Sequence, residues 1–174
     1  RDFKDFKNIK KYLELYPQQN LFHAEKISAF TNIPKENIIV LNGAMEIIQS
    51  ILINMKGKFL INLPTFSSYY EFISNNVNLI TTSHNGSAES FIESIDRYKP
   101  DNILIVNPNN PTGRFISLED IKSILNHINY KCNLIIDESF IHFASKLPLS
   151  ELSAESLVIE NDNLTIIKSM SKDF

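Results

Sequence analysis

Short apolar runs alternate with segments of helical periodicity along most of the chain. The runs are rich in Ile, Leu and Val, and six of them are predicted strands: 37–41, 58–62, 78–82, 102–107, 132–137 and 164–169. After the first run, apolar residues recur at the spacing of one helix face within 43–55, which predicts a helix there. A short helix is expected within 64–76, and longer ones around 88–98 and at 117–128, where Ser117 is the expected N-cap with Asp120 as its partner.

The predicted strands are nearly continuous apolar runs rather than alternating ones. Such runs are typical of a sheet whose two faces are both covered by helices. Repeated strand–helix units therefore predict an α/β fold with a doubly wound, mostly parallel sheet. Ligands of such sheets bind beyond the carboxyl ends of the strands, so these ends are where functional residues are expected.

Composition and charge narrow the class of protein. The chain has 174 residues, of which 43% are hydrophobic and 21% charged, as in an ordinary globular domain. A net charge of −3 gives no electrostatic reason to expect nucleic acid or an anionic membrane as a partner. The single cysteine, Cys132, excludes an internal disulfide framework and fits a reducing cytoplasm. The four histidines (23, 84, 127 and 142) lack metal-ligand spacing, so no metal site is predicted.

The two ends of the chain give a separate expectation. Arg1 is not an initiator methionine, the first residues lack a signal-peptide pattern, and the last residues follow directly on a predicted strand. Residues 1–174 are therefore interpreted as one partial domain of a longer protein, cut at both ends.

Unusual polar chemistry follows several of the predicted strands. The turn Asn42–Glu46 opens a helix whose free N–H groups favour phosphate, and Pro64-Thr65-Phe66 places an aromatic ring at the next strand end. The loop "NPNNPTG" occupies 107–113. Asp137-Glu138 closes an apolar strand, where a carboxylate is costly unless a cation or donor meets it. Finally, "SMSK" at 169–172 sets two hydroxyls beside a lysine.

These motifs resemble those of one enzyme family. "NPNNPTG", "IIDESF" and "SMSK" come in the order and with the spacing of the class I/II aminotransferases, the fold-type I enzymes that use pyridoxal 5'-phosphate. The resemblance covers nearly the whole chain, from Tyr16 to Lys172, and is nearest to the branch of histidinol-phosphate aminotransferases and threonine-phosphate decarboxylases. It implies the large, cofactor-binding domain of that fold, truncated before the small C-terminal domain.

The resemblance also implies roles for individual residues. Lys172 would form a Schiff base with the cofactor and then move protons as a general acid/base, for which its pKa must fall below about 10.4. Asp137 would pair with the pyridinium nitrogen so that the ring can accept electrons. Asn110 would hydrogen-bond the phenolic oxygen, and Phe66 would stack on the ring. The cofactor phosphate would be bound by the backbone N–H groups of Ala44 and Met45 and by the hydroxyls of Ser169 and Ser171.

Tyr16 and Tyr69 complete the expected site. Tyr16 matches a family tyrosine that reaches the cofactor phosphate of a partner subunit, so a homodimer with shared sites is expected. Tyr69 is expected on the substrate side of the ring. The role of Glu46, which follows the family's turn pattern, is left open.

One departure from the family pattern keeps the reaction open. The family often has a tyrosine three residues after the pyridine-binding aspartate, whereas this chain has Phe140. The phenylalanine is more typical of the threonine-phosphate decarboxylases. The leading hypothesis is an aminotransferase acting on a histidinol-phosphate-like amino acid and a 2-oxo acid. The alternatives are a decarboxylase of a phosphorylated amino acid and, from another class, a non-catalytic cofactor-binding relative.

Overall fold

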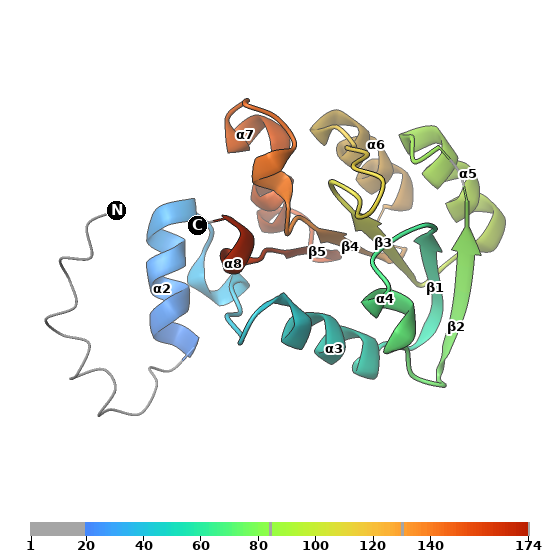
Figure 1. Cartoon of the computed structure of the whole chain (residues 1–174), viewed down its shortest axis with the longest axis horizontal. Coiled ribbons are helices and arrows are strands. Elements are labelled where there is room, and N and C mark those ends of the chain that lie inside the picture. Colours follow the sequence, from blue (N-terminus) through green and yellow to red (C-terminus); the bar gives the residue numbers. More distant parts are fainter. Residues whose placement is uncertain (1–19, 84, 130, 174) are drawn as a thin grey trace, which may run out of the picture. The chain divides into compact units, whose positions relative to one another are not determined.

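The computed structural model describes residues 20–83, 85–129 and 131–173 (Figure 1). These residues divide into two compact units, with the boundary between Val40 and Leu41. Tyr16 lies outside the described residues. Among the helices of these three segments, none is both long enough and apolar enough to cross a membrane.

The described part of the first unit, residues 20–40, contains one helix and one 3₁₀ turn. Helix α2 spans Asn20–Thr31 and η2 spans Lys35–Asn37. The strand expected at 37–41 is wrong, because Asn37 ends η2 and residues 38–41 belong to no strand. The amide of Asn20 donates to the carbonyl of Val40 at 2.6 Å and accepts from its N–H at 3.0 Å, so a side chain supplies the hydrogen bonds that a neighbouring strand would give. An apolar β-prone run forms a strand only where a partner strand is available.

The second unit is built on a five-stranded parallel sheet. Its strands are β1 (Gly57–Asn62), β2 (Val77–Thr82), β3 (Asn102–Val106), β4 (Asn133–Asp137) and β5 (Leu164–Ile167), in the order β2-β1-β3-β4-β5. Every neighbouring pair is parallel. The predicted α/β class and parallel sheet are confirmed, and five of the six predicted strands form within two residues of their expected bounds.

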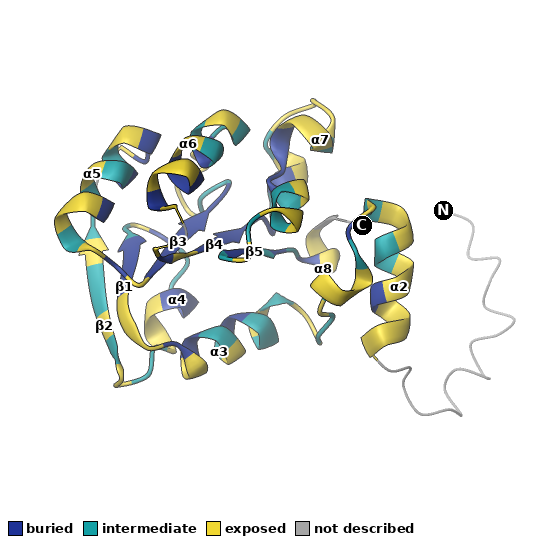
Figure 2. Ribbon diagram, turned by 180° about the vertical axis from the view of Figure 1, so that it is seen from behind, coloured by how far each residue is buried: buried dark blue, intermediate teal, exposed yellow. Residues whose placement is uncertain are grey.

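Helices cover both faces of this sheet (Figure 1). On one face lie α3 (Ala44–Asn54) and α4 (Ser68–Glu71), and on the other lie α5 (Ala88–Tyr98) and α6 (Leu118–Ile128). Strand β3, most of β4 and the middle of β1 are buried between the two layers, whereas the edge strand β2 is only partly buried, and the helices turn their exposed sides outward (Figure 2). The shorter elements are η3 (Ile141–Phe143), α7 (Leu149–Leu152), η4 (Glu155–Ile159) and α8 (Met170–Asp173).

Local sequence explains where the helices begin. The Ser117 hydroxyl accepts from the N–H of Asp120 at 3.1 Å and donates to its carboxylate at 2.8 Å, which confirms the predicted cap of α6. Ser87 caps α5 in the same way through the N–H of Ser90. Helix α3 is different, because its N-cap is Gly43 and no side chain caps it.

The connections change direction at β1. The chain passes from β1 to β2 on one side and then returns across β1 to β3 on the other, after which β4 and β5 follow in order. This is a topological switch point of a doubly wound sheet. The polar residues predicted from the sequence follow the carboxyl ends of β1, β3, β4 and β5, or precede α3, and are therefore set along one edge.

Candidate active site

Asp137 is the last residue of β4, and its carboxylate is buried with 5% of its surface exposed. Its Oδ2 accepts a hydrogen bond from the Tyr69 hydroxyl at 2.7 Å, and its Oδ1 accepts from the N–H of Ser139 at 2.8 Å. In the described part of the chain it forms no ion pair. Two neutral donors thus orient a buried anion without neutralising it, which leaves the carboxylate able to pair with a cationic ligand group.

The hydrogen bond from Tyr69 to Asp137 was not predicted from the sequence. It lies in α4 with 2% of its surface exposed, and its ring meets that of Phe66 edge to face with centroids 6.3 Å apart. Burial first, and then the charge of Asp137, raise the pKa of the Tyr69 phenol well above its ordinary value. The hydroxyl therefore stays protonated and remains a donor to Asp137. Tyr69 follows Phe66 by three residues in the sequence, but no local pattern shows that its hydroxyl contacts Asp137, 68 residues further along the chain.

Lys172 lies in α8, just beyond the end of β5. Its ammonium is exposed and stands 5.0 Å from the centroid of the Phe140 ring. Phe140 follows Asp137 by three residues, and Asp137 is paired with Ile167 in the β4–β5 register. The structure therefore brings the predicted lysine and aspartate to the ends of neighbouring strands. A phenylalanine under the lysine stabilises the cation through its ring face and offers it no hydrogen bond.

The two serines of the "SMSK" motif lie together. The Ser169 hydroxyl is 3.0 Å from that of Ser171, and the N–H of Lys172 donates to the Ser169 carbonyl at 3.1 Å. Ser169 is buried at 5% exposure, whereas Ser171 is exposed. The turn thus presents two hydroxyls and the lysine from four consecutive residues.

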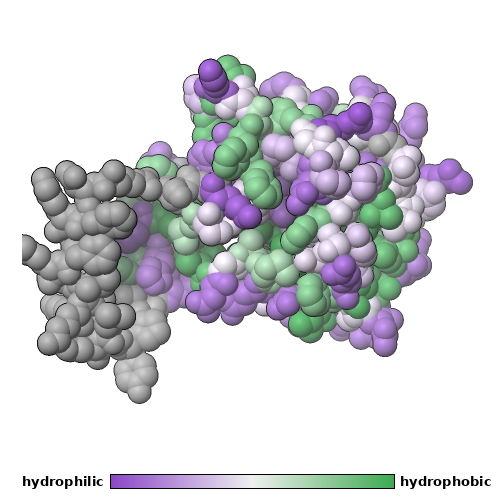
Figure 3. All heavy atoms as spheres, viewed as in Figure 1, coloured by the Kyte–Doolittle hydropathy of each residue, from purple (hydrophilic) through white to green (hydrophobic). Residues whose placement is uncertain are grey.

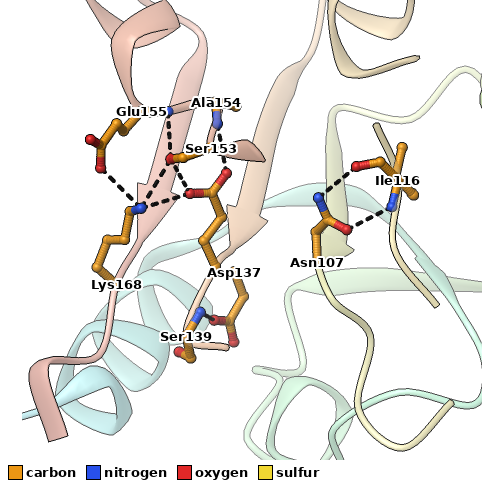
Figure 4. Close-up of polar contacts among 9 residues, drawn as sticks. Asn107, Ile116, Asp137, Ser139, Ser153, Ala154, Glu155 and Lys168 are labelled. Atoms are coloured by element: carbon orange, nitrogen blue, oxygen red, sulfur yellow. Dashed lines mark hydrogen bonds and ion pairs between the residues drawn. The ribbon is translucent and has the colours of Figure 1, made fainter. Parts of the chain in front are cut away.

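The "NPNNPTG" loop is held by its asparagines. Asn107 is fully buried, and its amide donates to the carbonyl of Ile116 at 2.9 Å and accepts from its N–H at 2.8 Å (Figure 4). Asn109 donates to the carbonyl of Pro64 at 3.0 Å and to the Thr112 hydroxyl at 2.8 Å. Rigidity thus comes from a buried amide that closes the loop as well as from its prolines. Asn110 is half-buried, and its side-chain amide makes no hydrogen bond in the described residues, so it is available to a ligand.

The start of α3 offers uncapped N–H groups. Gly43 has φ +86° and ψ 163°, a conformation that side-chain-bearing residues rarely adopt, and nothing lies within 4 Å of the place where its Cβ would be. Ala44 and Met45 follow as the first helical residues, and their N–H groups have no acceptor within the helix. Glu46 accepts from the N–H of Asn42 at 2.6 Å, which gives that residue a role in shaping the turn.

A cavity of about 210 Å³ opens at the switch point, at the carboxyl ends of β1 and β3. It is lined by Pro64, Thr65, Asn109 and Arg114 among others, and its lining includes neither Asp137 nor Lys172. The cavity is therefore distinct from the group of predicted catalytic residues, which lie at the ends of β4 and β5.

The residues present fit pyridoxal phosphate. A cofactor of this chemistry needs an amine for its aldehyde, an anion for its ring nitrogen and donors for its phosphate. The exposed Lys172, the buried and unneutralised Asp137, the two hydroxyls of the serine turn and the uncapped start of α3 supply these groups.

The chain belongs to the aminotransferase class I and II family, whose model matches residues 2–174. This family consists of enzymes that depend on pyridoxal phosphate, so the family and the cofactor predicted from the sequence are confirmed.

The individual relatives include both decarboxylases and aminotransferases. An L-serine phosphate decarboxylase of Campylobacter jejuni is 40% identical over 178 residues, covering 98% of this chain and 46% of that protein. The L-serine phosphate decarboxylase of Sulfurospirillum multivorans is 36% identical over 173 residues, covering 95% and 44%. A histidinol-phosphate aminotransferase of Methanococcus aeolicus is 31% identical over 181 residues, covering 98% and 46%. The chain spans about half the length of the curated relatives it matches.

Solved structures share the fold. A decarboxylase from Sulfurospirillum multivorans superposes with a TM-score of 0.86 at 32% identity, over 99% of this chain and 46% of that one. A histidinol-phosphate aminotransferase from Sinorhizobium meliloti, solved in complex with pyridoxal-5'-phosphate, gives 0.81 at 14% identity, over 95% and 46%. The second likeness shows the fold alone.

Proposed function

We propose that the protein is a pyridoxal-phosphate-dependent decarboxylase of an O-phosphorylated amino acid, with L-serine phosphate as the leading substrate. The observation that carries this proposal is the 40% and 36% identity, over nearly the whole chain, to two L-serine phosphate decarboxylases. This ranks the decarboxylase above the aminotransferase that was the first hypothesis from the sequence. Phe140 supports the same choice, since it stands where many aminotransferases have a tyrosine.

The bound cofactor would supply an electron sink for the electron pair left when a bond to the substrate Cα breaks. Lys172 is the proposed point of covalent attachment, and its exposed ammonium is free to change partners during turnover. Asp137 would hold the proton on the ring nitrogen, because its buried carboxylate has donors but no cation in the described residues. Asn110 would donate to the phenolic oxygen, and Phe66 would cover one face of the ring.

The phosphate of the cofactor would lie between α3 and the serine turn. The N–H groups of Ala44 and Met45 and the positive end of the helix favour an anion there. Ser169 and Ser171 would add hydroxyl donors, since their side chains otherwise bond each other.

Transamination is the second candidate, and the 31% identical histidinol-phosphate aminotransferase is the observation that favours it. The two reactions differ in which bond to Cα is cleaved. They can therefore be separated by product. The full-length native protein, loaded with pyridoxal phosphate, is incubated with L-serine phosphate alone and with a 2-oxo acid added.

A decarboxylase releases CO₂ and an amine phosphate in stoichiometric amounts without the 2-oxo acid. An aminotransferase releases no CO₂ and needs the 2-oxo acid for repeated turnover. Lys172→Ala should abolish either activity and the borohydride-fixed label on the peptide around residues 169–173. Lys122→Ala, at an exposed lysine of α6 that pairs with Glu119, is the matched control. Labelling of another lysine in the active protein would refute the assignment of Lys172.

We further propose a homodimer, with small-molecule substrates as its other partners. Large apolar side chains are exposed in the second unit, among them Met45 (38%), Phe143 (71%) and Met170 (53%), and apolar patches interrupt the polar surface in Figure 3. Met45 and Met170 belong to the turns proposed to hold the cofactor, so a partner subunit docked there would also enclose the site. A cytoplasmic location is proposed from the lone Cys132, which is a free and buried thiol.

The proposed role of Tyr16 in the partner's site has its own test. Inactive Tyr16→Ala and Lys172→Ala proteins are mixed under conditions in which subunits exchange. If sites are shared, each heterodimer holds one site with both native residues and activity partly returns. A mixture that stays inactive after confirmed exchange means that Tyr16 serves its own subunit.

A further inference from the structure

Behind the proposed site lies a second charged cluster, around Glu138. Its carboxylate is fully buried and accepts from the N–H of Ala154 at 2.8 Å, from the Ser153 hydroxyl and from the Lys168 ammonium at 2.9 Å, the three labelled residues whose dashed lines meet in Figure 4. Lys168 also donates to Ser153 at 3.0 Å and pairs with Glu155 at 2.9 Å. One lysine therefore serves two carboxylates, and the inner one has no access to water.

Stability alone does not explain this ion pair, in which the Glu138 carboxylate is fully buried and the Lys168 side chain is 26% exposed. Removing a carboxylate from water is costly, and the attraction to a partner commonly does no more than offset that cost. Apolar residues of the same volume would give a core of similar stability. What an ion pair with three further hydrogen bonds supplies is a fixed geometry.

The place of the cluster shows which geometry it fixes. Glu138 follows Asp137, and Lys168 precedes Ser169, so each partner is the chain neighbour of a proposed cofactor-binding residue. The strand ladder ends at the pair Asp137–Ile167, followed by one more backbone bond from the N–H of Glu138 to the Ile167 carbonyl at 2.8 Å. Beyond that bond the sheet no longer fixes the spacing of the two strand ends. The Glu138–Lys168 pair bridges them at that point.

We infer that Glu138 and Lys168 are positioning residues, whose ion pair sets the separation of Asp137 from the Ser169–Lys172 turn and thereby the affinity of the site for pyridoxal phosphate. This inference rests on the proposed function, because it assigns the cofactor to that turn. Neither side chain would contact the cofactor. Both would act through the residues next to them in the chain.

The test is a double-mutant cycle in the full-length native protein, made with Glu138→Gln, Lys168→Met and the two together. The cofactor is removed, and the dissociation constant of added pyridoxal phosphate is measured for each protein, beside its urea-unfolding curve and the pH titration of its visible cofactor band. Each single variant should bind pyridoxal phosphate about ten-fold more weakly, as when a supporting partner of a ligand-binding residue is lost. Glu119→Gln and Lys122→Met alter an exposed pair of the same length, 2.9 Å, and should leave the affinity within about two-fold.

The double variant separates positioning from stability. It leaves no fully buried charge without a partner, since the Glu155 carboxylate that also loses Lys168 is 24% exposed, so its resistance to urea should recover relative to the single variants. Its affinity for pyridoxal phosphate should nevertheless stay about ten-fold low, with the same altered pH titration of the visible band. Lys168→Arg keeps the charge and the donors, so it should show wild-type affinity for pyridoxal phosphate and a wild-type pH titration of the visible band. This variant also keeps the inference testable if a neutral variant does not fold.

Wild-type affinity in the folded double variant would overturn the inference, as would Lys168→Arg behaving like Lys168→Met. Failure of the wild-type protein to bind pyridoxal phosphate through Lys172 would instead refute the proposed function. The two failures are therefore distinguishable in one set of proteins.

Discussion

Replacing Tyr69 by phenylalanine removes one oxygen atom from the molecule and one donor from Asp137. The ring keeps its place against Phe66, and the change leaves Asp137 Oδ2 without its 2.7 Å hydrogen bond. Tyr70 is the next residue, 41% exposed, and its hydroxyl makes no hydrogen bond in the described residues. Tyr70→Phe is therefore a matched control, with the same atom removed one position along the same short helix.

The size of the effect follows from burial and charge. A hydrogen bond to a charged acceptor contributes about 1.5–3 kcal/mol, and both partners here are at most 5% exposed, so water does not readily replace the lost donor. We expect Tyr69→Phe to lower the free energy of unfolding by about 1.5–3 kcal/mol, against about 0.5 kcal/mol or less for Tyr70→Phe. The measurement is urea unfolding of the cofactor-free protein, followed by circular dichroism.

The pH dependence gives a second comparison. Burial, and next the charge of Asp137, raise the pKa of Tyr69 above 10.0, so the folded state holds this proton more tightly than the unfolded state does. The contribution of the phenol is therefore complete below about pH 10 and declines as the pH rises further. The difference between wild type and Tyr69→Phe should be constant near neutral pH and shrink at alkaline pH. Equal losses for Tyr69→Phe and Tyr70→Phe would refute the reasoning.

Three further predictions concern the asparagine loop, Asp137 and the buried Cys132. Asn107→Ala should lower the free energy of unfolding in urea by about 2–6 kcal/mol, because it leaves two buried backbone groups of Ile116 unpaired. Asn110→Ala should lower it by less than about 1 kcal/mol and alter the cofactor spectrum instead. Asp137→Asn should lower turnover by orders of magnitude with a modest loss of cofactor affinity, and near-normal turnover would mean that another residue faces the ring nitrogen. Burial raises the pKa of the Cys132 thiol to about 11. Iodoacetamide at pH 8 should therefore label Cys132 slowly in the native protein and fast in urea. Rapid labelling of the native protein would contradict its burial.

Periodicity predicted most of the second unit because its elements obey local rules. The apolar runs that became β1, β3 and β4 are buried on both faces, and the Ser117 cap fixes the start of α6 through contacts within four residues. The failure at 37–41 has the opposite cause. That run has the composition of a strand, but whether it pairs depends on a neighbour, and here Asn20 takes the backbone of Val40 instead.

For the candidate site, the sequence predicted the residues that belong to recognisable motifs and missed the contacts between motifs. Asp137 ends β4 and Lys172 follows the neighbouring β5, and parallel neighbouring strands bring their carboxyl ends to one edge. The Tyr69–Asp137 bond and the Glu138–Lys168 pair were not predicted. Each joins segments at least 30 residues apart through side chains that have ordinary surface or core explanations where they stand in the sequence.

The alternation of side chains along β4 and β5 explains why Asp137 and Ser169 lie on one face of the sheet and the Glu138–Lys168 pair on the other. Ile135 and Ile167 pack in the core beneath α3 and α4, and the residues two further on, Asp137 and Ser169, belong to the same face. Ile136 packs in the core beneath α5 and α6, and Glu138 follows it on that face, next to Ala154 of the same core. A slip of one residue at the end of β5 would exchange Lys168 and Ser169 between the faces. It would remove a hydroxyl from the proposed phosphate site and bury it against Glu138. The hydrogen-bond ladder resists such a slip only as far as Ile167, and beyond it the Glu138–Lys168 pair is the contact that distinguishes the two registers.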